Sequence, residues 1–567
     1  SELFDRPSIN LGRILGGDAL NKVPDTCFID VDVRHLPEQD PESILDEVRG
    51  IPGATVVSTF KRPPADVDPE LPFVRALREA TAQYTNGETT SVGRDGASDA
   101  VSFLKVGIPA VEFGPVAPQR RKGQFMGAAP GLARSEDCLS VNVIAPDGID
   151  STSGRPVMVF IHGGAYSVGS SGEYPRQGER LARDHGIVYV SMNYRLGALG
   201  WLDLRVYSTP ERPIEANLGL RDQVAALEWV RRNIRTFGGD PDRVTLFGES
   251  AGANSVTTLL TVPAAGGLFS SAISQSSPAN AVYLPETTAR WAREYVQLLS
   301  RVVDDDDLES ESVEDAAAML CTADAMQLAD ATTALTIRTP DEDPGTICLA
   351  PVIDGEFLPH RPLDAFRDGL AHRVPLIIGT NDREGSLFEG RIGILPTTKP
   401  RIRAIFANTR TRSRKAIKRQ YPELPERRPA ADFAGDFTFW FPSVKVAERH
   451  SRYAPTSMYR FDAAPRMPRL LGLDATHGLE LFALFEKFDT PTGAGLTMLG
   501  GRRMFRAVGR RMQAHWVALA ASGAPLDDWP RYDETARRTL VFDRVDRVEL
   551  DPRREKRLAW QEFVPHV

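Results

Sequence analysis

The residues best suited to chemistry form a Gly-x-Ser-x-Gly pattern that runs from Gly248 to Gly252. An apolar run at residues 244–247 precedes it, and a segment that can form a helix, residues 253–260, follows it. A serine in such a turn between strand and helix has its hydroxyl lifted out of the sheet at a helix N-terminus. Ser250 is therefore a candidate nucleophile, although an isolated match of this pattern also occurs in ordinary turns.

A serine hydroxyl is a poor nucleophile at neutral pH, so Ser250 needs a positioned base. Histidine suits this role because its pKa lies near neutral pH. Where such an elbow occurs, the expected chain order is serine, then acid, then histidine. His477 lies in a loop just after a strand-like segment, which makes it the best-placed base. The later histidines in less suitable positions precede the best acid candidate, lie in polar helix-like segments or stand beside the C-terminus: His360, His372, His450, His515 and His566.

The acid partner must orient the imidazole and stabilise its charged form. Two carboxylates, Asp382 and Glu384, follow the strand-like residues 374–378. Either could instead be a surface carboxylate paired with Arg383, which stands between them. Position favours Glu384 and leaves Asp382 as the alternative.

The oxyanion that develops when serine attacks a carbonyl carbon needs preorganised hydrogen-bond donors. The sequence His-Gly-Gly-Ala-Tyr at residues 162–166 stands at the end of a strand-like run, where glycines let the backbone approach a substrate. We expect the N–H groups of Gly163, Gly164 and Ala251 to form this oxyanion hole. A plain turn is the other interpretation of the His-Gly-Gly loop.

Strand-like and helix-like segments alternate from about residue 156 onward. Several of the strand-like runs are apolar on both faces, as buried parallel strands should be. A helix is expected over residues 220–234, and the strand-like runs are 156–161, 186–190, 244–247, 374–378 and 457–461. The fold class is therefore α/β, with a doubly wound, mostly parallel sheet whose chemistry gathers at the carboxyl ends of the strands.

The first 114 residues have a different organisation, with short βα units and Pro/Gly punctuation. We predict a boundary near residues 113–119, which separates residues 1–114 from residues 115–567.

The composition of the 567-residue chain limits the classes of partner that we expect for it. A net charge of -8 argues against nucleic acid as the main partner. The locally basic segment 401–428 is interpreted as a solvated helix face. The sequence has no run of about 18 apolar residues, so it does not predict a membrane span.

The cysteines and the first residues bear on the compartment. The four cysteines are widely separated, without metal-type spacing, and do not make a disulfide framework. The first residues do not have a signal-peptide pattern. We therefore expect a cytoplasmic protein.

From about Phe113 to the C-terminus these motifs resemble the carboxylesterase type B, or cholinesterase-like, branch of the α/β-hydrolases. Glu249 in the elbow is itself typical of that branch. The other segments that carry the resemblance are 135–143, 162–166, 193–197, 217–223, 237–241, 381–388 and 477–480. The resemblance implies an α/β-hydrolase fold and a serine carboxylic-ester hydrolase that acts on small-molecule esters without a metal or organic cofactor. It also implies Ser250 as nucleophile, Glu384 as acid and His477 as base.

The chain departs from this branch in two places. Arg383 stands where many members have an acidic residue, and the segment that normally precedes the Glu-Asp-Cys motif at residues 136–138 is missing. Residues 7–115 instead resemble a fragment of the zinc aminoacylase and succinyl-diaminopimelate desuccinylase-like metallopeptidases. Segments 9–14, 21–25, 30–34, 96–100 and 107–110 carry that likeness.

The clustered ligands of a binuclear zinc site cannot be assembled in the N-terminal region. We therefore expect an N-terminal α+β metallopeptidase-like fragment, made of half a dimerisation domain and the end of a metal domain, fused to an esterase. The alternatives are a catalytically weak or inactive binding protein on the α/β-hydrolase fold and metallopeptidase activity from the N-terminal region. We expect a monomer or a weak homodimer.

Overall fold

The computed structural model describes residues 8–16, 27–34, 40–51, 112–113, 138–172, 177–303, 312–407 and 409–563. The predicted motifs at residues 21–25, 96–100, 107–110 and 135–137 lie outside these ranges, as does His566. The chain divides into two compact units, Ser1–Glu112 with Gly131–Ala133 and Phe113–Pro130 with Arg134–Val567. Each unit is described by itself.

The first unit contains an antiparallel strand pair, β1 (Ser8–Gly16) and β2 (Cys27–Arg34), with a register shift between Leu11 and Arg13. It also contains helix α1 (Pro41–Arg49). The Asp40 side chain accepts a hydrogen bond from the Glu42 N–H, which satisfies a donor at the helix N-terminus.

A ten-stranded sheet forms the framework of the second unit, in the order β12-β11-β10-β9-β8-β7-β5-β6-β4-β3. Neighbouring strands from β6 to β11 in this order are parallel, whereas β4 and β12 pair antiparallel with β6 and β11. The strands are β3 (Glu112–Phe113), β4 (Val141–Ile144), β5 (Arg155–Ile161), β6 (Val188–Met192), β7 (Gly239–Glu249), β8 (Ser271–Gln275), β9 (Leu376–Asn381), β10 (Thr456–Phe461), β11 (Arg538–Phe542) and β12 (Arg547–Leu550).

Strands β6, β8 and β9 are buried at every residue, as expected for parallel strands covered on both faces. The mostly parallel, doubly wound sheet agrees with the predicted fold class. The strand expected to start at residue 186 begins instead at Val188, because Gly186 ends helix α4 with a φ of 69°. Glycine adopts this left-handed conformation without strain.

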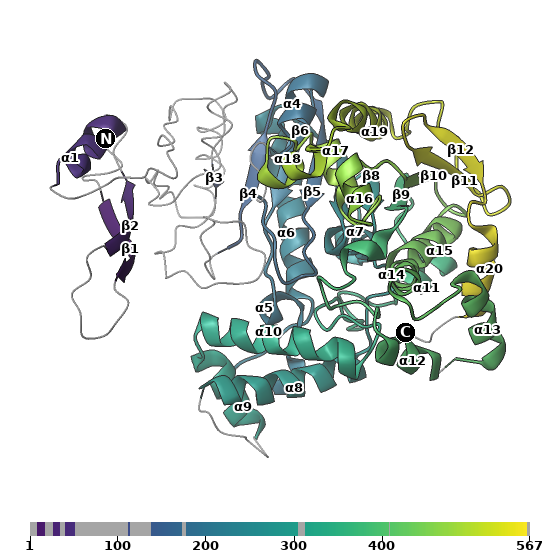
Figure 1. Cartoon of the computed structure of the whole chain (residues 1–567), viewed down its shortest axis with the longest axis horizontal. Coiled ribbons are helices and arrows are strands. Elements are labelled where there is room, and N and C mark those ends of the chain that lie inside the picture. The colour runs from purple at the N-terminus through teal and green to yellow at the C-terminus, as the bar shows by residue number, and fades with distance from the viewer. Residues whose placement is uncertain are drawn as a thin grey trace. The chain divides into compact units, whose positions relative to one another are not determined.

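Helices surround the sheet, as Figure 1 shows. α19 contacts α4 and the strands β5, β7 and β8. α7 contacts the same three strands. A hydrogen bond from Gln223 in α6 to Ser255 in α7 joins these two helices. The helices of this unit are α4 (Glu179–His185), α5 (Ala198–Trp201), α6 (Leu218–Asn233), α7 (Ala251–Leu259), α8 (Pro285–Val303), α9 (Val313–Thr322), α10 (Ala325–Glu342), α11 (Pro362–Asp368), α12 (Lys399–Ala407), α13 (Thr411–Gln420), α14 (Arg427–Gly435), α15 (Phe441–His450), α16 (Arg466–Leu470), α17 (Leu479–Leu484), α18 (Pro491–Thr497), α19 (Arg502–Ser522) and α20 (Arg554–Glu562).

The basic segment 401–428 covers portions of α12 and α14 and all of α13. Most charged side chains of α13 are exposed, as expected for a solvated helix face. Arg401 of α12 differs from these exposed side chains, because it is buried and pairs with Asp341 at 2.7 Å. Composition gives no indication of this buried arginine.

The chain order reverses between β5 and β7, which are neighbours in the sheet although β6 lies between them in sequence. Ligands of open α/β sheets bind at such a switch point, beyond the carboxyl ends of the strands. Here those ends are Ile161 and Glu249, which are followed directly by the His-Gly-Gly loop and by Ser250.

Candidate active site

Ser250 occupies a sharp turn between β7 and α7. Its backbone has φ 58° and ψ −123°, a conformation that non-glycine residues rarely adopt. Two backbone hydrogen bonds hold the turn, from Ser250 N–H to the Gln275 carbonyl and from Asn254 N–H to the Ser250 carbonyl, both at 2.9 Å. This geometry is that of a nucleophile elbow.

Glycine at 252 is a steric requirement of this turn. A Cβ there would lie 2.1 Å from the Ile161 carbonyl oxygen at the end of β5. A Cβ at Gly248 would lie 2.6 Å from the backbone of Gly252. The strand and the helix therefore meet too closely for side chains, as the pattern indicates.

Ser250, His477 and Glu384 form a continuous hydrogen-bonded chain. Ser250 Oγ is 2.8 Å from His477 Nε2, and His477 Nδ1 is 2.6 Å from Glu384 Oε2. His477 is 8% exposed and Glu384 is 3% exposed. With its proton on Nδ1, the imidazole donates to the carboxylate and leaves Nε2 free to accept the serine proton.

The second oxygen of Glu384 is also held. Ser276 Oγ–H donates to Glu384 Oε1 at 2.6 Å, and the Asn381 N–H donates to the same oxygen at 2.7 Å. These donors orient the carboxylate so that its other oxygen lies against the imidazole. The sequence contains Ser276, but no local motif indicates its contact with an acid loop far along the chain.

Asp382, the alternative acid, lies elsewhere. Its carboxylate is 2.6 Å from Arg553 Nη2 and 3.8 Å from Arg460 Nε. Burial raises the pKa of Asp382, but the two guanidinium groups outweigh burial and hold it below its usual range. The structure therefore brings Glu384, and not Asp382, to the histidine.

The charge of His477 is set by three buried carboxylates. Burial alone lowers the pKa of His477, but Glu249, Glu384 and Glu480 outweigh it and raise the pKa to about 9. Glu249 Oε1 lies 3.3 Å from His477 Nε2, the nitrogen that also contacts Ser250. The imidazolium is therefore strongly stabilised.

Glu480 forms the outer portion of this charge network. Burial raises its pKa to about 7, and repulsion from Glu384 acts in the same direction. The Asn381 Nδ2–H donates to Glu480 Oε2 and, at 2.8 Å, to the Thr476 carbonyl oxygen. Asn381 therefore connects the acid loop to the histidine loop.

The His-Gly-Gly loop begins where β5 ends. Gly164 has a φ of 112°, and its carbonyl oxygen accepts the N–H groups of Ser167 and Val168. At Gly163 a Cβ would lie 2.8 Å from the Glu249 carbonyl oxygen and 3.1 Å from Ser250 Cβ, so this loop reaches the elbow itself. Glycine permits both the turn and the close approach.

The predicted oxyanion donors come from the two segments that meet at Ser250. Gly163 and Gly164 belong to the loop after β5, and Ala251 is the first residue of α7. Within the described ranges of the chain, none of their three N–H groups donates to another backbone group. They are therefore available to a substrate oxygen.

His162 supports this loop from behind. Its Nδ1 lies 2.8 Å from the Gly163 carbonyl oxygen, and its ring stacks on Tyr194 with centroids 4.4 Å apart. Burial lowers the pKa of His162 to about 4, so the ring is neutral at physiological pH. Tyr194 also donates its hydroxyl to the His162 carbonyl oxygen at 2.7 Å.

Arg383 joins the acid loop to the histidine loop. Nη1 contacts the Gly472 carbonyl oxygen at 2.8 Å and Asp474 Oδ2 at 2.9 Å, while Nε contacts Asp432 Oδ1 of α14 at 2.9 Å. Its backbone N–H donates to the Ala475 carbonyl oxygen. The alternative pairing of Arg383 with a neighbouring carboxylate is therefore wrong, because the side chain turns toward the histidine loop.

Aromatic side chains cover the imidazole. The rings of Phe439 and Phe388 lie 4.3 and 5.3 Å from the His477 ring, centroid to centroid. Leu395 packs with both phenylalanines. This cover lowers the local polarity and limits the access of water to the imidazole.

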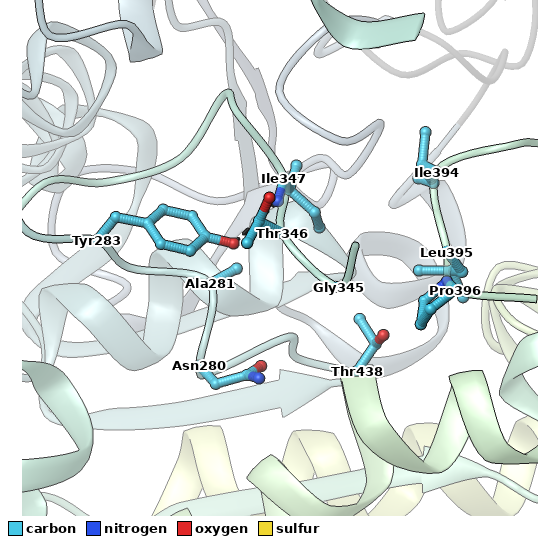
Figure 2. Close-up of a pocket in the computed structure, with 10 residues that line it drawn as sticks. All are labelled: Asn280, Ala281, Tyr283, Gly345, Thr346, Ile347, Ile394, Leu395, Pro396 and Thr438. Atoms are coloured by element: carbon cyan, nitrogen blue, oxygen red, sulfur yellow. Dashed lines mark hydrogen bonds between the residues drawn. The ribbon is translucent and has the colours of Figure 1, made fainter. Parts of the chain in front are cut away.

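A pocket lies next to this aromatic cover, with which it shares Leu395. Figure 2 shows its lining, with Tyr283 Oη accepting the Ile347 N–H at 2.9 Å. None of the lining side chains carries a charge. They are Asn280, Ala281, Tyr283, Gly345, Thr346, Ile347, Ile394, Leu395, Pro396 and Thr438.

Three of the other later histidines have contacts away from Ser250. His450 Nε2 lies 2.9 Å from the Val374 carbonyl oxygen and His372 Nε2 lies 2.8 Å from that of Val262. His515 packs against Trp529. His450 and His515 are both buried, although the helix-like segments that carry them are polar in sequence.

Metal clusters and membrane spans are two further features that could change the chemistry of the chain. Among the described ranges, no group of three or more His, Cys, Asp or Glu side chains is placed to hold a metal ion. Of the helices in those ranges, none has the length and apolar character needed to cross a bilayer.

Comparison with known proteins bears on the identity of both units. Residues 105–560 match the Carboxylesterase family and residues 1–57 match a Peptidase dimerisation domain. Para-nitrobenzyl esterase of Bacillus subtilis (strain 168) is 34% identical over 459 residues, covering 79% of this chain and 88% of that protein. A solved PNB esterase structure has a TM-score of 0.65 at 35% identity, with the same coverage of each chain. A Geobacillus stearothermophilus carboxylesterase structure has a TM-score of 0.65 at 31% identity, covering 79% and 89%.

Proposed function

Because this chain belongs to the carboxylesterase family of ester hydrolases, we propose that Ser250, His477 and Glu384 act as its nucleophile, base and acid. The observation that supports these roles is the continuous contact from Ser250 Oγ to His477 Nε2, at 2.8 Å, and from His477 Nδ1 to Glu384 Oε2, at 2.6 Å. Nucleophile, base and orienting acid in hydrogen-bond reach are what acyl transfer requires.

In the first half-reaction Ser250 Oγ attacks the ester carbonyl carbon while His477 Nε2 takes the serine proton. The carbonyl oxygen becomes negative and accepts hydrogen bonds from the N–H groups of Gly163, Gly164 and Ala251. Glu384 stabilises the imidazolium without taking its proton. His477 then donates the proton to the departing alcohol, which leaves an acyl group on Ser250.

In the second half-reaction a water molecule gives a proton to His477 and attacks the acyl carbon. The same three N–H groups stabilise the second oxyanion. When the tetrahedral intermediate collapses, the acid is released and Ser250 recovers its proton from His477. Neither half-reaction needs a cofactor.

We propose small esters with uncharged groups as the substrates. The cavity beside Phe388 and Phe439 supports this choice, because its lining combines aliphatic side chains with the neutral polar groups of Asn280, Thr346 and Thr438. A charged group placed there would lose its hydration without gaining an ionic partner. Uncharged acyl or alcohol groups avoid that cost.

Ser250→Ala tests the assignment. We expect the purified wild-type protein to hydrolyse p-nitrophenyl acetate and to react once per chain with a fluorophosphonate probe, and the variant to do neither. Ser522→Ala, at the exposed end of α19, is the matched control and should behave like the wild type. Equal hydrolysis by wild type and Ser250→Ala would refute the nucleophile. A folded wild type that reacts with neither reagent would favour a binding protein on this fold.

Three expectations stay predictions. They are a monomer or weak homodimer, a cytoplasmic location, and a fused, metal-free N-terminal fragment over residues 1–114. Size-exclusion chromatography with light scattering tests the first of them.

A further inference from the structure

Four exposed apolar side chains lie at the ends of two neighbouring short helices, α16 and α18. These helices contact each other. The exposed fractions are 72% for Leu470, 51% for Leu471, 66% for Met498 and 43% for Leu499. We call these four residues the apolar patch.

The loop after α18 connects the segments that carry the two halves of the apolar patch. A Cβ at Gly501 would lie 3.3 Å from Pro465 Cα, so the loop that carries Met498 and Leu499 packs on the start of α16. α16 spans Arg466–Leu470, which is about 7 Å of helix at 1.5 Å per residue. Leu470 and Leu471 therefore lie no further than the length of this short helix from the point where the loop packs.

Arginines surround the apolar patch. Arg466 and Arg469 are exposed on α16, and Arg503 is exposed at the start of α19. None of the three forms an ion pair with a carboxylate in the ranges that the structure describes. They make this face locally positive, although the whole chain carries a net charge of -8.

The acidic groups close to the apolar patch are already paired. Asp489 contacts Arg502. Asp474 contacts Arg383 at 2.9 Å and Arg428 at 3.4 Å. They therefore do not neutralise the three arginines around the patch.

We propose that the apolar patch, with Arg466, Arg469 and Arg503, docks the protein onto an anionic lipid surface. Leucine and methionine side chains that enter the interfacial region leave water, and arginines at the rim attract anionic headgroups. A second copy of the chain fits this face less well, because a symmetric contact would bring the two sets of arginines together.

The location of the patch gives docking a consequence for the site. Leu471 is followed directly by the turn Gly472–Asp474, which Arg383 holds and which leads to His477. A lipid surface at the patch would therefore lie beside the histidine loop. An ester dissolved in that surface would be delivered near the site.

Co-sedimentation of the full-length protein with vesicles tests docking without relying on activity. We expect binding to vesicles of phosphatidylcholine with phosphatidylglycerol, much weaker binding to phosphatidylcholine alone, and weakening with added salt. Leu470→Ser with Met498→Ser should lower the partition constant about ten-fold or more. Arg466→Gln, Arg469→Gln and Arg503→Gln together should lower it by about five-fold for each arginine.

The matched control is the pair Ile337→Ser and Val545→Ser, which removes apolar side chains that are 62% and 78% exposed elsewhere. It should bind like the wild type, and circular dichroism checks that every variant is folded. A wild type that does not bind anionic vesicles at low salt would overturn the proposal. So would equal binding by the patch variant and the control. A dimer in sedimentation velocity that only the patch variant loses would assign the face to a second copy.

Discussion

Arg383 Nη1 lies 2.9 Å from Asp474 Oδ2, so the residue before the proposed acid is tied to the turn before the proposed base. Asp474 has a φ of 52°, a left-handed conformation that the arginine contact helps to hold. Ser386 adds a parallel connection, donating its hydroxyl to the Leu473 carbonyl oxygen at 2.6 Å. The relative position of Glu384 and His477 depends on these contacts between their two loops.

Arg383→Gln should lower kcat by about 10²-fold with little change in KM, because a displacement of about 1 Å between catalytic groups has a cost of this size. Arg383→Lys should recover only a fraction of the loss, since an ammonium group cannot reproduce the guanidinium fork. Steady-state kinetics on a soluble p-nitrophenyl ester measures both effects.

Arg428→Gln is the control for this prediction, because Arg428 contacts the same Asp474 carboxylate from an exposed position. Its kinetics should match those of the wild type. If Arg383→Gln keeps the wild-type kcat, the contacts of Arg383 do not position the site.

The raised pKa of His477 predicts an alkaline pH profile. His477 must be neutral to accept the proton of Ser250, and its pKa is raised from the ordinary value of about 6.5 to about 9. The value of kcat/KM should therefore rise with pH as the imidazolium deprotonates. Glu249→Gln removes a carboxylate that stabilises the imidazolium, so its profile should shift toward lower pH.

Glu228→Gln, a change on the exposed side of α6, should leave the profile in place. Histidine signals in ¹⁵N-edited NMR, assigned with a His477→Gln sample, provide a readout besides activity. An unchanged His477 titration in Glu249→Gln would contradict the proposed origin of the raised pKa.

Gly252→Ala should prevent formation of the elbow. The new methyl group would lie 2.1 Å from the Ile161 carbonyl oxygen, which is backbone of a central strand and cannot move away easily. Overpacking of this kind costs about 1–3 kcal/mol or more. We expect a lower midpoint of urea denaturation and loss of fluorophosphonate labelling.

Gly495→Ala is the matched control for this substitution. A Cβ at Gly495 has no neighbouring atom within 4 Å, and the residue lies inside helix α18. Alanine favours a helix there, so stability should stay the same or rise slightly. A Gly252→Ala protein as stable as the control would show that the elbow tolerates a side chain.

The fold class and the candidate residues follow from sequence because their signals are local. Buried parallel strands are apolar on both faces, and the elbow around Ser250 requires glycines at fixed positions beside it. The chain order of serine, carboxylate and histidine, together with position next to strand-like segments, then reduces the candidates to His477 and to either Glu384 or Asp382.

Only the tertiary structure decided which carboxylate reaches His477. Asp382 and Glu384 follow the same strand, and their local sequence is compatible with the role in both cases. Asp382 is drawn to Arg553 of the C-terminal helix region, while Ser276 from another strand end orients Glu384. The tertiary structure also decided three further features of the site. They are the contacts of Arg383, the cover of Phe388 and Phe439 over the imidazole, and the raised pKa of His477. Each of these features results from contacts between groups that are far apart along the chain. Such contacts depend on distances and burial that exist only once the chain has folded.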